Sequence, residues 1–81
     1  MITLQQVEAQ ISRNVEQWRQ GRGATKKFIA AKLGMSRDTY DRRLIDGGWS
    51  FREVCRAADA LGISSSELVP AEFLNVNQDA A

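Results

Sequence analysis

The chain has 81 residues, of which 43% are hydrophobic and 26% charged, and its formal net charge is +1. This length and composition are typical of one globular domain, while a single cysteine and the lack of histidine exclude an internal disulfide and disfavour a structural zinc site. Because the usual general base at neutral pH is missing, we expect neither an enzyme nor any catalytic residue, metal or cofactor.

The net charge hides an uneven distribution along the chain. Residues 12–43 carry nine lysines and arginines against three acids, a net +6, whereas residues 44–81 carry a net −4. A basic half and an acidic half in one small domain indicate a face that meets an anionic partner.

The N-terminal stretch MITLQQVEAQ has no basic region followed by an apolar run, so it does not resemble a signal peptide. No apolar stretch approaches the roughly 18–20 residues that span a bilayer. Together with the single cysteine, these features predict a cytoplasmic protein without a membrane partner.

The first predicted helix covers residues 4–20. Thr3 and Gln6 form a Thr-x-x-Gln capping box in front of it, and glycines at 21 and 23 end it. Apolar side chains recur along it at helical spacing: Leu4, Val7, Ile11, Val15 and Trp18.

Two shorter helices follow the first. One is predicted over residues 26–33 with Thr25 as its N-cap, and the other over residues 37–46 with Ser36 as its N-cap. Gly34 lies between them, where helices often end in a left-handed residue, and a glycine pair ends the second of the two.

A fourth helix is predicted over residues 51–61, opened by a Ser-x-x-Glu capping box and closed by Gly62. A short fifth helix, capped by Ser64 or Ser65, should end near Val69. The pattern as a whole predicts an all-α fold, a compact bundle of about five helices joined by short connections. We expect four of the six aromatic side chains to belong to the core: Trp18, Phe28, Tyr40 and Phe51.

Residues 1–69 are expected to form the domain and residues 70–81 a C-terminal tail whose last five or so residues are disordered. The tail contains Phe73, Leu74 and Val76, which either contact a second copy of the chain or cover the domain's own core.

The second and third predicted helices and the turn between them form a helix-turn-helix pattern. Ala30 lies four residues before Gly34, and a small residue there lets the two helices pack closely. Gly34 can adopt positive φ, which would cost a side chain roughly 1–2 kcal/mol. The apolar contacts around the turn come from Ile29, Leu33, Met35 and Tyr40.

Residues 25–69, "TKKFIAAKLGMSRDTYDRRLIDGGWSFREVCRAADALGISSSELV", resemble a lambda-repressor-like (Cro/repressor, XRE-type) helix-turn-helix domain. The ending "ADALGISSSELV" is similar to that family's segment from helix 4 to helix 5. Three features depart from the family pattern: the first helix is long, Lys26 replaces a common glutamine, and Arg43 replaces a usual apolar residue.

The resemblance implies sequence-specific binding of double-stranded DNA by a transcription regulator of phage or prophage type, repressor-like or Cro-like. Such a protein occupies an operator and blocks polymerase in a bacterial cell or phage-infected host. Because the family commonly binds two-fold sites as dimers, a homodimer stays open, and no small-molecule ligand is expected.

If the third predicted helix enters the major groove, its outward residues reach the base edges. Tyr40 and Leu44 should point inward, and the candidate base contacts are Ser36, Arg37, Asp38, Thr39, Asp41 and Arg42. Arginine grips guanine bidentately and aspartate accepts from cytosine. The two aspartates therefore either read cytosine or orient the neighbouring arginines.

Candidate contacts to the DNA backbone are Arg22, Thr25, Lys26, Lys27 and Arg43. The N-terminal amides of the second helix can also face a phosphate. Two directions stay open at this point. Arg43 either touches phosphate or lies along the surface, and Trp49 either packs on the core or approaches the DNA backbone.

The charged residues 37–42 also fit a simpler interpretation, a solvated helix face. The main alternative function is a protein-binding module, such as an antitoxin or accessory factor with the same fold, and a nuclease or other enzyme is a distant third. The charge asymmetry favours DNA, since a module built for a protein partner needs no basic half.

Overall fold

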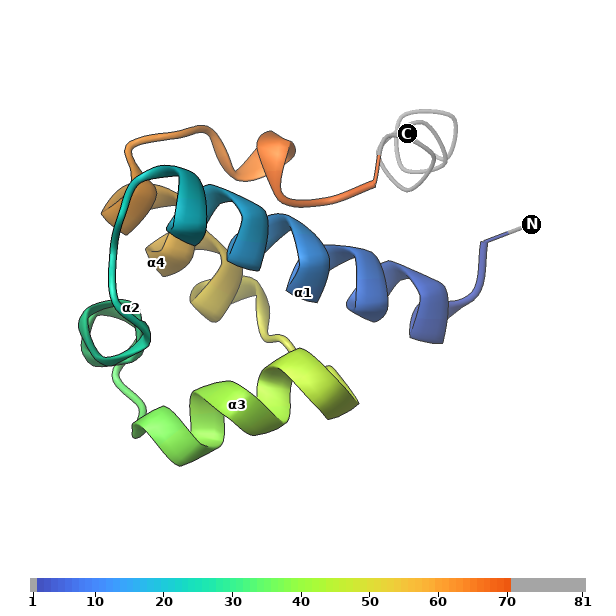
Figure 1. The fold of residues 1–81 in the computed structure, drawn as a ribbon. Coiled ribbons are helices and arrows are strands. Elements are labelled where there is room, and N and C mark those ends of the chain that lie inside the picture. Colours follow the sequence, from blue (N-terminus) through green and yellow to red (C-terminus); the bar gives the residue numbers. More distant parts are fainter. Residues whose placement is uncertain (1, 71–81) are drawn as a thin grey trace.

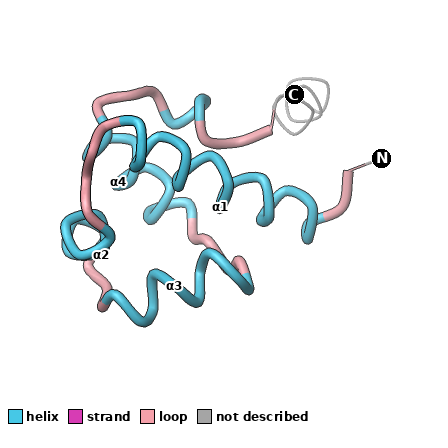
Figure 2. Tube along the Cα trace, viewed as in Figure 1, coloured by secondary structure: helices cyan, strands magenta, loops and turns pink. Residues whose placement is uncertain are grey.

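The structure is a computed structural model that describes residues 2–70, and this part of the chain contains helices and loops but no strand (Figure 1). Its elements in chain order are α1 (Leu4–Gly21), α2 (Lys26–Leu33), α3 (Arg37–Asp46), α4 (Phe51–Leu61) and the 3₁₀ turn η1 (Ser65–Glu67). Short loops join them (Figure 2). The predicted all-α class is thereby confirmed, and no helix in the described part is long and apolar enough to cross a membrane.

Capping side chains determine where the four α-helices begin. Each predicted N-cap has an extended backbone and accepts a hydrogen bond from the amide three residues further on: Thr3, Thr25, Ser36 and Ser50. At α1 and α4 the glutamine or glutamate at the third helical position bonds back to the cap amide, which completes both predicted capping boxes. All four helices begin at the predicted residue.

The predicted fifth helix is a short 3₁₀ turn and not an α-helix. Instead of a helix ending near Val69, the chain makes a single 3₁₀ turn, η1, for which Ser64 accepts a hydrogen bond from the Ser66 amide. Pro70 follows closely, and a proline cannot donate the backbone bond that would extend a helix. Such short pieces favour the tighter 3₁₀ geometry.

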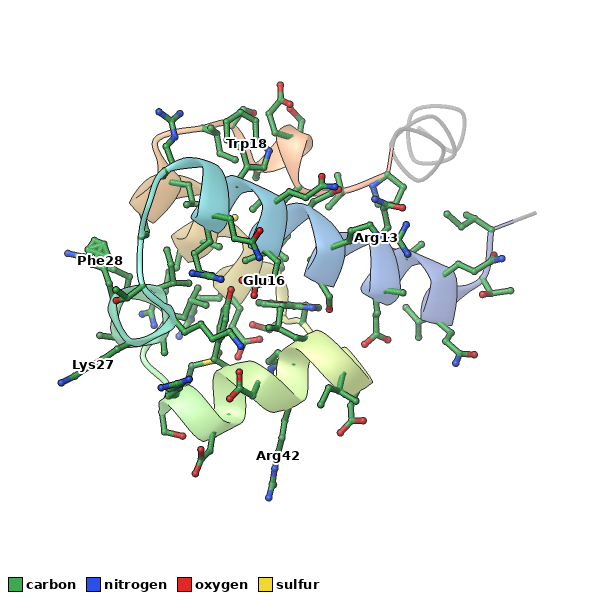
Figure 3. All side chains as sticks on the ribbon, in the orientation of Figure 1. Arg13, Glu16, Trp18, Lys27, Phe28 and Arg42 are labelled. Atoms are coloured by element: carbon green, nitrogen blue, oxygen red, sulfur yellow. The ribbon has the colours of Figure 1, made fainter. Side chains whose placement is uncertain are left out.

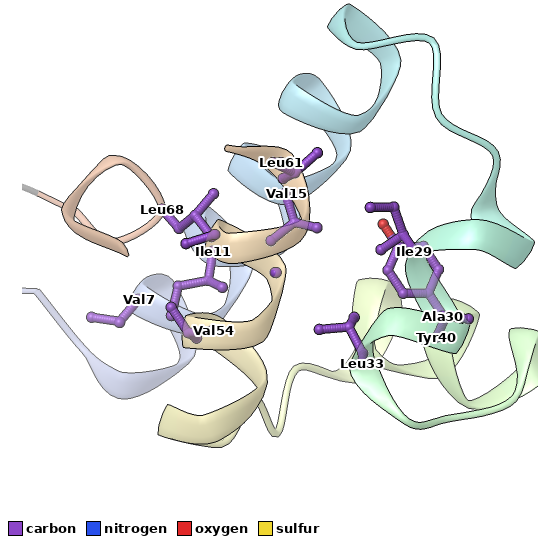
Figure 4. Close-up of a cluster of buried hydrophobic side chains, with 12 residues drawn as sticks. Val7, Ile11, Val15, Ile29, Ala30, Leu33, Tyr40, Val54, Leu61 and Leu68 are labelled. Atoms are coloured by element: carbon purple, nitrogen blue, oxygen red, sulfur yellow. The ribbon is translucent and has the colours of Figure 1, made fainter. Parts of the chain in front are cut away.

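The core lies where α1 and α4 meet α2 and α3 (Figure 4). Tyr40, Ile29, Val15 and Leu68 are the largest side chains that are fully buried. Leu68 shows that the segment after η1 closes the bundle, because it comes from beyond the last helix. The remaining core residues are Val7, Ile11, Ala30, Leu33, Val54, Ala57, Ala58 and Leu61.

The prediction that Trp18, Phe28, Tyr40 and Phe51 belong to the core is only partly right. Tyr40 is buried and Trp18 packs against the core, but Phe28 is 42% and Phe51 83% exposed. Phe51 is the first residue of α4, and among the described residues little covers that turn. Phe28 lies on the surface of α2, with the Lys32 ammonium 5.3 Å from its ring centroid.

The loop between α3 and α4 is bonded to α1 through Ser12, the only buried polar residue in the described part of the chain. The Ser12 hydroxyl donates to the carbonyl of Arg43 at 2.9 Å and accepts from the indole N–H of Trp49 at 2.9 Å. The indole also lies edge-on to the Tyr40 ring, with 6.4 Å between centroids. Trp49 therefore packs on the core, which is one of the two directions left open by the sequence.

Gly47 and Gly48 bring this loop close to α1. Gly47 has φ +79° and is buried against Glu8, whose carboxylate accepts a hydrogen bond from the Gly48 amide. Residues 71–81, which include the predicted tail contacts Phe73, Leu74 and Val76, lie outside the described residues. The predicted domain boundary at residue 70 therefore stays a prediction.

The two loop glycines offer a matched test. Gly47→Ala should lower the free energy of unfolding by about 2 kcal/mol or more, because a side chain at positive φ costs roughly 1–2 kcal/mol and the new Cβ would lie 2.8 Å from the Cβ of Glu8. Gly48 has φ +76°, and no described atom lies within 4 Å of a Cβ placed there. Gly48→Ala should therefore lower the free energy of unfolding only by the roughly 1–2 kcal/mol that positive φ costs. Urea denaturation measures both, and equal losses would contradict the close contact with Glu8.

Candidate nucleic-acid interface

A tight left-handed turn joins α2 to α3. Gly34 has φ +73° and ψ 31°, its amide donates to the carbonyl of Ala31, and the Met35 amide donates to that of Ala30 at 3.0 Å. This pair of bonds is the Schellman pattern that ends a helix. Ala30 is 2% exposed, so its small side chain allows the close packing predicted for it.

The inner face of α3 fixes which of its residues face outward. Tyr40 is fully buried and Leu44 packs against the core, as predicted. Arg37, Asp38 and Arg42 are exposed. The side chain of Arg42 extends away from the bundle on the outer side of α3 (Figure 3). Asp38 and Arg42 therefore lie opposite the buried tyrosine, and Arg37 is exposed at the start of the helix.

The hydroxyls of Ser36 and Thr39 are linked at the N-terminus of α3. Ser36 Oγ accepts from the Thr39 amide at 3.1 Å and donates to Thr39 Oγ1 at 3.0 Å. The Thr39 hydroxyl thus serves as an acceptor here and keeps its own proton to donate. Ser36 is engaged chiefly as the cap.

Asp41 connects α3 to α2. Its carboxylate accepts from the Lys26 ammonium at 3.2 Å, and both side chains are about one-third exposed. Asp41 therefore pairs across the helix-turn-helix with Lys26 and not with either neighbouring arginine. This pair brings a predicted base contact and a predicted backbone contact together.

The other residues predicted to contact the DNA backbone differ in whether their side chains already have a partner within the protein. Lys27 is exposed on α2 and extends outward (Figure 3). Thr25 Oγ1 accepts from the Phe28 amide at 3.0 Å as the cap of α2. The Arg22 guanidinium lies 5.4 Å from the centroid of the Trp18 ring, which is a cation–π geometry.

Arg43 points toward α4, which answers the question of its direction. Its Nε and Nη2 donate to the two carboxylate oxygens of Glu53 at 3.0 and 3.1 Å. Burial raises the pKa of Glu53, but these bonds, the Ser50 amide and the charge of Arg43 outweigh burial and leave the pKa below its ordinary value. Arg43 thus ties α3 to the first turn of α4, and its predicted contact with a DNA backbone stays a prediction.

A second polar cluster holds α3 from the side of α1, and no sequence motif indicates it. The Tyr40 hydroxyl donates to Glu16 at 3.0 Å, and Arg19 pairs with the same carboxylate while donating to the carbonyl of Ala24 at 2.7 Å. Burial raises the pKa of Glu16, yet the bonds from Arg19 and Tyr40 and the charges of Arg19 and Lys26 lower it below the ordinary value. The one sequence signal for this cluster is the three-residue spacing of Glu16 and Arg19, which is typical of an ion pair within a helix.

No family model matches the chain, and no curated protein matches its sequence. Solved structures do match its fold. A hypothetical transcription factor from Neisseria has a TM-score of 0.71 at 20% identity, with 94% of this chain and 91% of that chain covered. The restriction-modification controller protein C.AhdI from Aeromonas hydrophila has a TM-score of 0.68 at 19% identity, with coverages of 75% and 94%.

A third similar structure is part of a larger protein. It is the hydroxypropylphosphonic acid epoxidase from S. wedmorenis, with a TM-score of 0.73 at 19% identity, and the match covers 82% of this chain and 36% of the epoxidase chain. The chain thus spans about a third of that enzyme. These likenesses bear out the predicted fold: residues 2–70 have the lambda-repressor-like helix-turn-helix fold.

The pKa of Glu16 makes a pH-dependent prediction. Because the folded-state pKa lies below the unfolded value of about 4.3, the bonds to Glu16 stabilise the fold above that pH and are lost as the pH falls through the folded-state pKa. Glu16→Gln should therefore cost about 1–2 kcal/mol at pH 7 and less in acid. Urea denaturation from pH 7 down to below the unfolded-state pKa measures this change in the free energy of unfolding. The exposed Glu67→Gln is the control. A loss independent of pH would contradict the ionic role of Glu16.

Proposed function

We propose that this protein is a sequence-specific, double-stranded DNA-binding transcription regulator of phage or prophage type, repressor-like or Cro-like, that acts by occupying an operator. The observation that carries the proposal is that Arg37 and Arg42 are both exposed on α3, the helix that follows the left-handed turn and buries Tyr40 in the core. The fold is consistent with it, because two proteins of similar structure are described as a hypothetical transcription factor and a restriction-modification controller protein.

In this proposal α3 lies in the major groove. Arg37 and Arg42 each bind O6 and N7 of a guanine, and Asp38 accepts from the amino group of a cytosine. The Thr39 hydroxyl, which accepts from Ser36, donates its proton to a base acceptor. Asp41 is partly neutralised by Lys26, which reduces its repulsion from nearby phosphates.

The same placement sets α2 across the DNA backbone. The free amides in its first turn and the exposed Lys27 face a phosphate, with Thr25 holding the start of the helix in shape. Arg22 extends this contact from the loop before α2. Arg43 can add the two N–H groups of Nη1 and the second N–H of Nη2, because the N–H of Nε and one N–H of Nη2 bond Glu53.

A salt titration on duplex DNA tests the proposal as a whole. Each phosphate contact should contribute about −0.9 to the slope of log K against log salt concentration, so four to five contacts predict a slope of about −4. Fluorescence anisotropy with a labelled duplex measures it. If no duplex binds at low salt, the protein-binding alternative replaces this proposal.

Substitutions separate the residues that read bases from those that bind phosphates. Once a site has been selected from a random DNA pool, Arg37→Ala and Arg42→Ala should each lower affinity by roughly 1–3 kcal/mol and relax preference at one base pair. Lys27→Ala should weaken binding to all sequences alike, and Arg13→Ala, on the exposed side of α1, is the charge-matched control. If the two arginine variants bind every sequence more weakly with unchanged preference, α3 does not read the bases. An inverted repeat in the selected site would indicate that two copies bind.

A further inference from the structure

An apolar groove lies between the N-terminal half of α1, the start of α4 and the segment that follows η1. It has a volume of about 550 Å³, and its apolar lining includes Leu4, Val7, Trp49, Phe51, Val54 and Val69. Leu4 is 74% and Phe51 83% exposed, so two large apolar side chains at its rim lie uncovered by the described residues. Large exposed apolar surfaces on a small domain are usually covered by a partner or another part of the chain.

The described chain ends at the wall of this groove. Val69 lines it, and Pro70, the last described residue, is buried. The sequence continues Ala-Glu-Phe-Leu-Asn-Val, so Phe73 comes three residues after the proline. Three residues of extended chain reach about 10 Å, which is enough to cross a groove of this size.

We propose that residues 71–76 of the same chain bind in this groove, with the side chains of Phe73 and Leu74 covering Phe51 and Leu4. The short tether favours this occupant over a second copy of the chain. A segment that begins directly after Pro70 and extends six residues beyond it has an effective concentration at the groove on the order of millimolar, well above that of a separate molecule at ordinary protein concentrations. The fixed φ of Pro70 further limits the conformations that the tether loses on binding.

This binding is independent of the proposed DNA contacts. No residue of α2 or α3 lines the groove, whereas the candidate base contacts all lie at the start of α3 or along it. The segment 71–81 also carries Glu72 and Asp79 but no lysine or arginine, so it adds no charge that would attract a phosphate. Its test therefore needs no DNA, and the proposed function and this inference can fail separately.

Trp49 lines the groove and reports on its occupant. In the full chain with Trp18→Phe, which leaves one tryptophan, acrylamide should quench Trp49 about twofold more strongly after Phe73→Ser and Leu74→Ser together, because the indole then loses its apolar cover. The matched control changes polar neighbours in the same segment, Asn75→Ser with Asn77→Ser, and should leave quenching unchanged. Equal quenching in the full chain and in the Phe73/Leu74 variant would overturn the proposal.

A variant on the groove side checks that both halves make the same contact. Phe51→Ser, which changes an exposed residue outside the core, should also raise quenching, and combining it with the Phe73/Leu74 variant should add nothing further. Independent, additive increases would contradict the contact. Sedimentation equilibrium identifies the occupant: protection of Trp49 that persists in the monomer supports the proposal. Protection that appears only as the mass rises to two chains would assign the groove to a second copy.

Discussion

The burial of Tyr40 is the constraint on which the arrangement of this domain depends. Its ring is fully enclosed at the contact between α3 and the other helices, and its hydroxyl is bonded to Glu16 on α1. A buried phenol requires an acceptor, and here the acceptor is a carboxylate that also binds Arg19. The ring therefore fixes both the depth and the rotation of α3, and this rotation decides which side chains face outward.

Features encoded by neighbouring residues could be predicted from the sequence. The four N-caps and the left-handed glycine after α2 depend on residues within a few positions of each other, so the helix starts and the helix-turn-helix were correct. The short fifth helix failed because the choice between an α-helix and a 3₁₀ turn over so few residues is governed by packing, here of Leu68 in the core. The prediction that Phe51 is buried was wrong for a related reason: periodicity identifies the apolar face of a helix but not which other element covers it.

Contacts between residues distant in the sequence could not be predicted at all. The bonds from Arg43 to Glu53 and from Trp49 to Ser12 join residues whose positions follow only from the packed helices. Arg37, Asp38 and Arg42 are exposed on α3, as expected once Tyr40 and Leu44 point inward, and their contact with bases stays a prediction. The pairing of Asp41 with Lys26 was missed, because it depends on the angle between α2 and α3.

The Lys26–Asp41 pair has a consequence for how this surface meets a charged ligand. The Lys26 ammonium has three N–H donors and gives one to the Asp41 carboxylate at 3.2 Å, so a phosphate can accept a second N–H while the pair stays intact. Because both side chains are about one-third exposed, solvent screens the pair, and breaking it would cost at most about 1 kcal/mol. The pair therefore governs where the ammonium lies more than how strongly it attracts an anion: Asp41 holds the cation of Lys26 at the junction of α2 and α3.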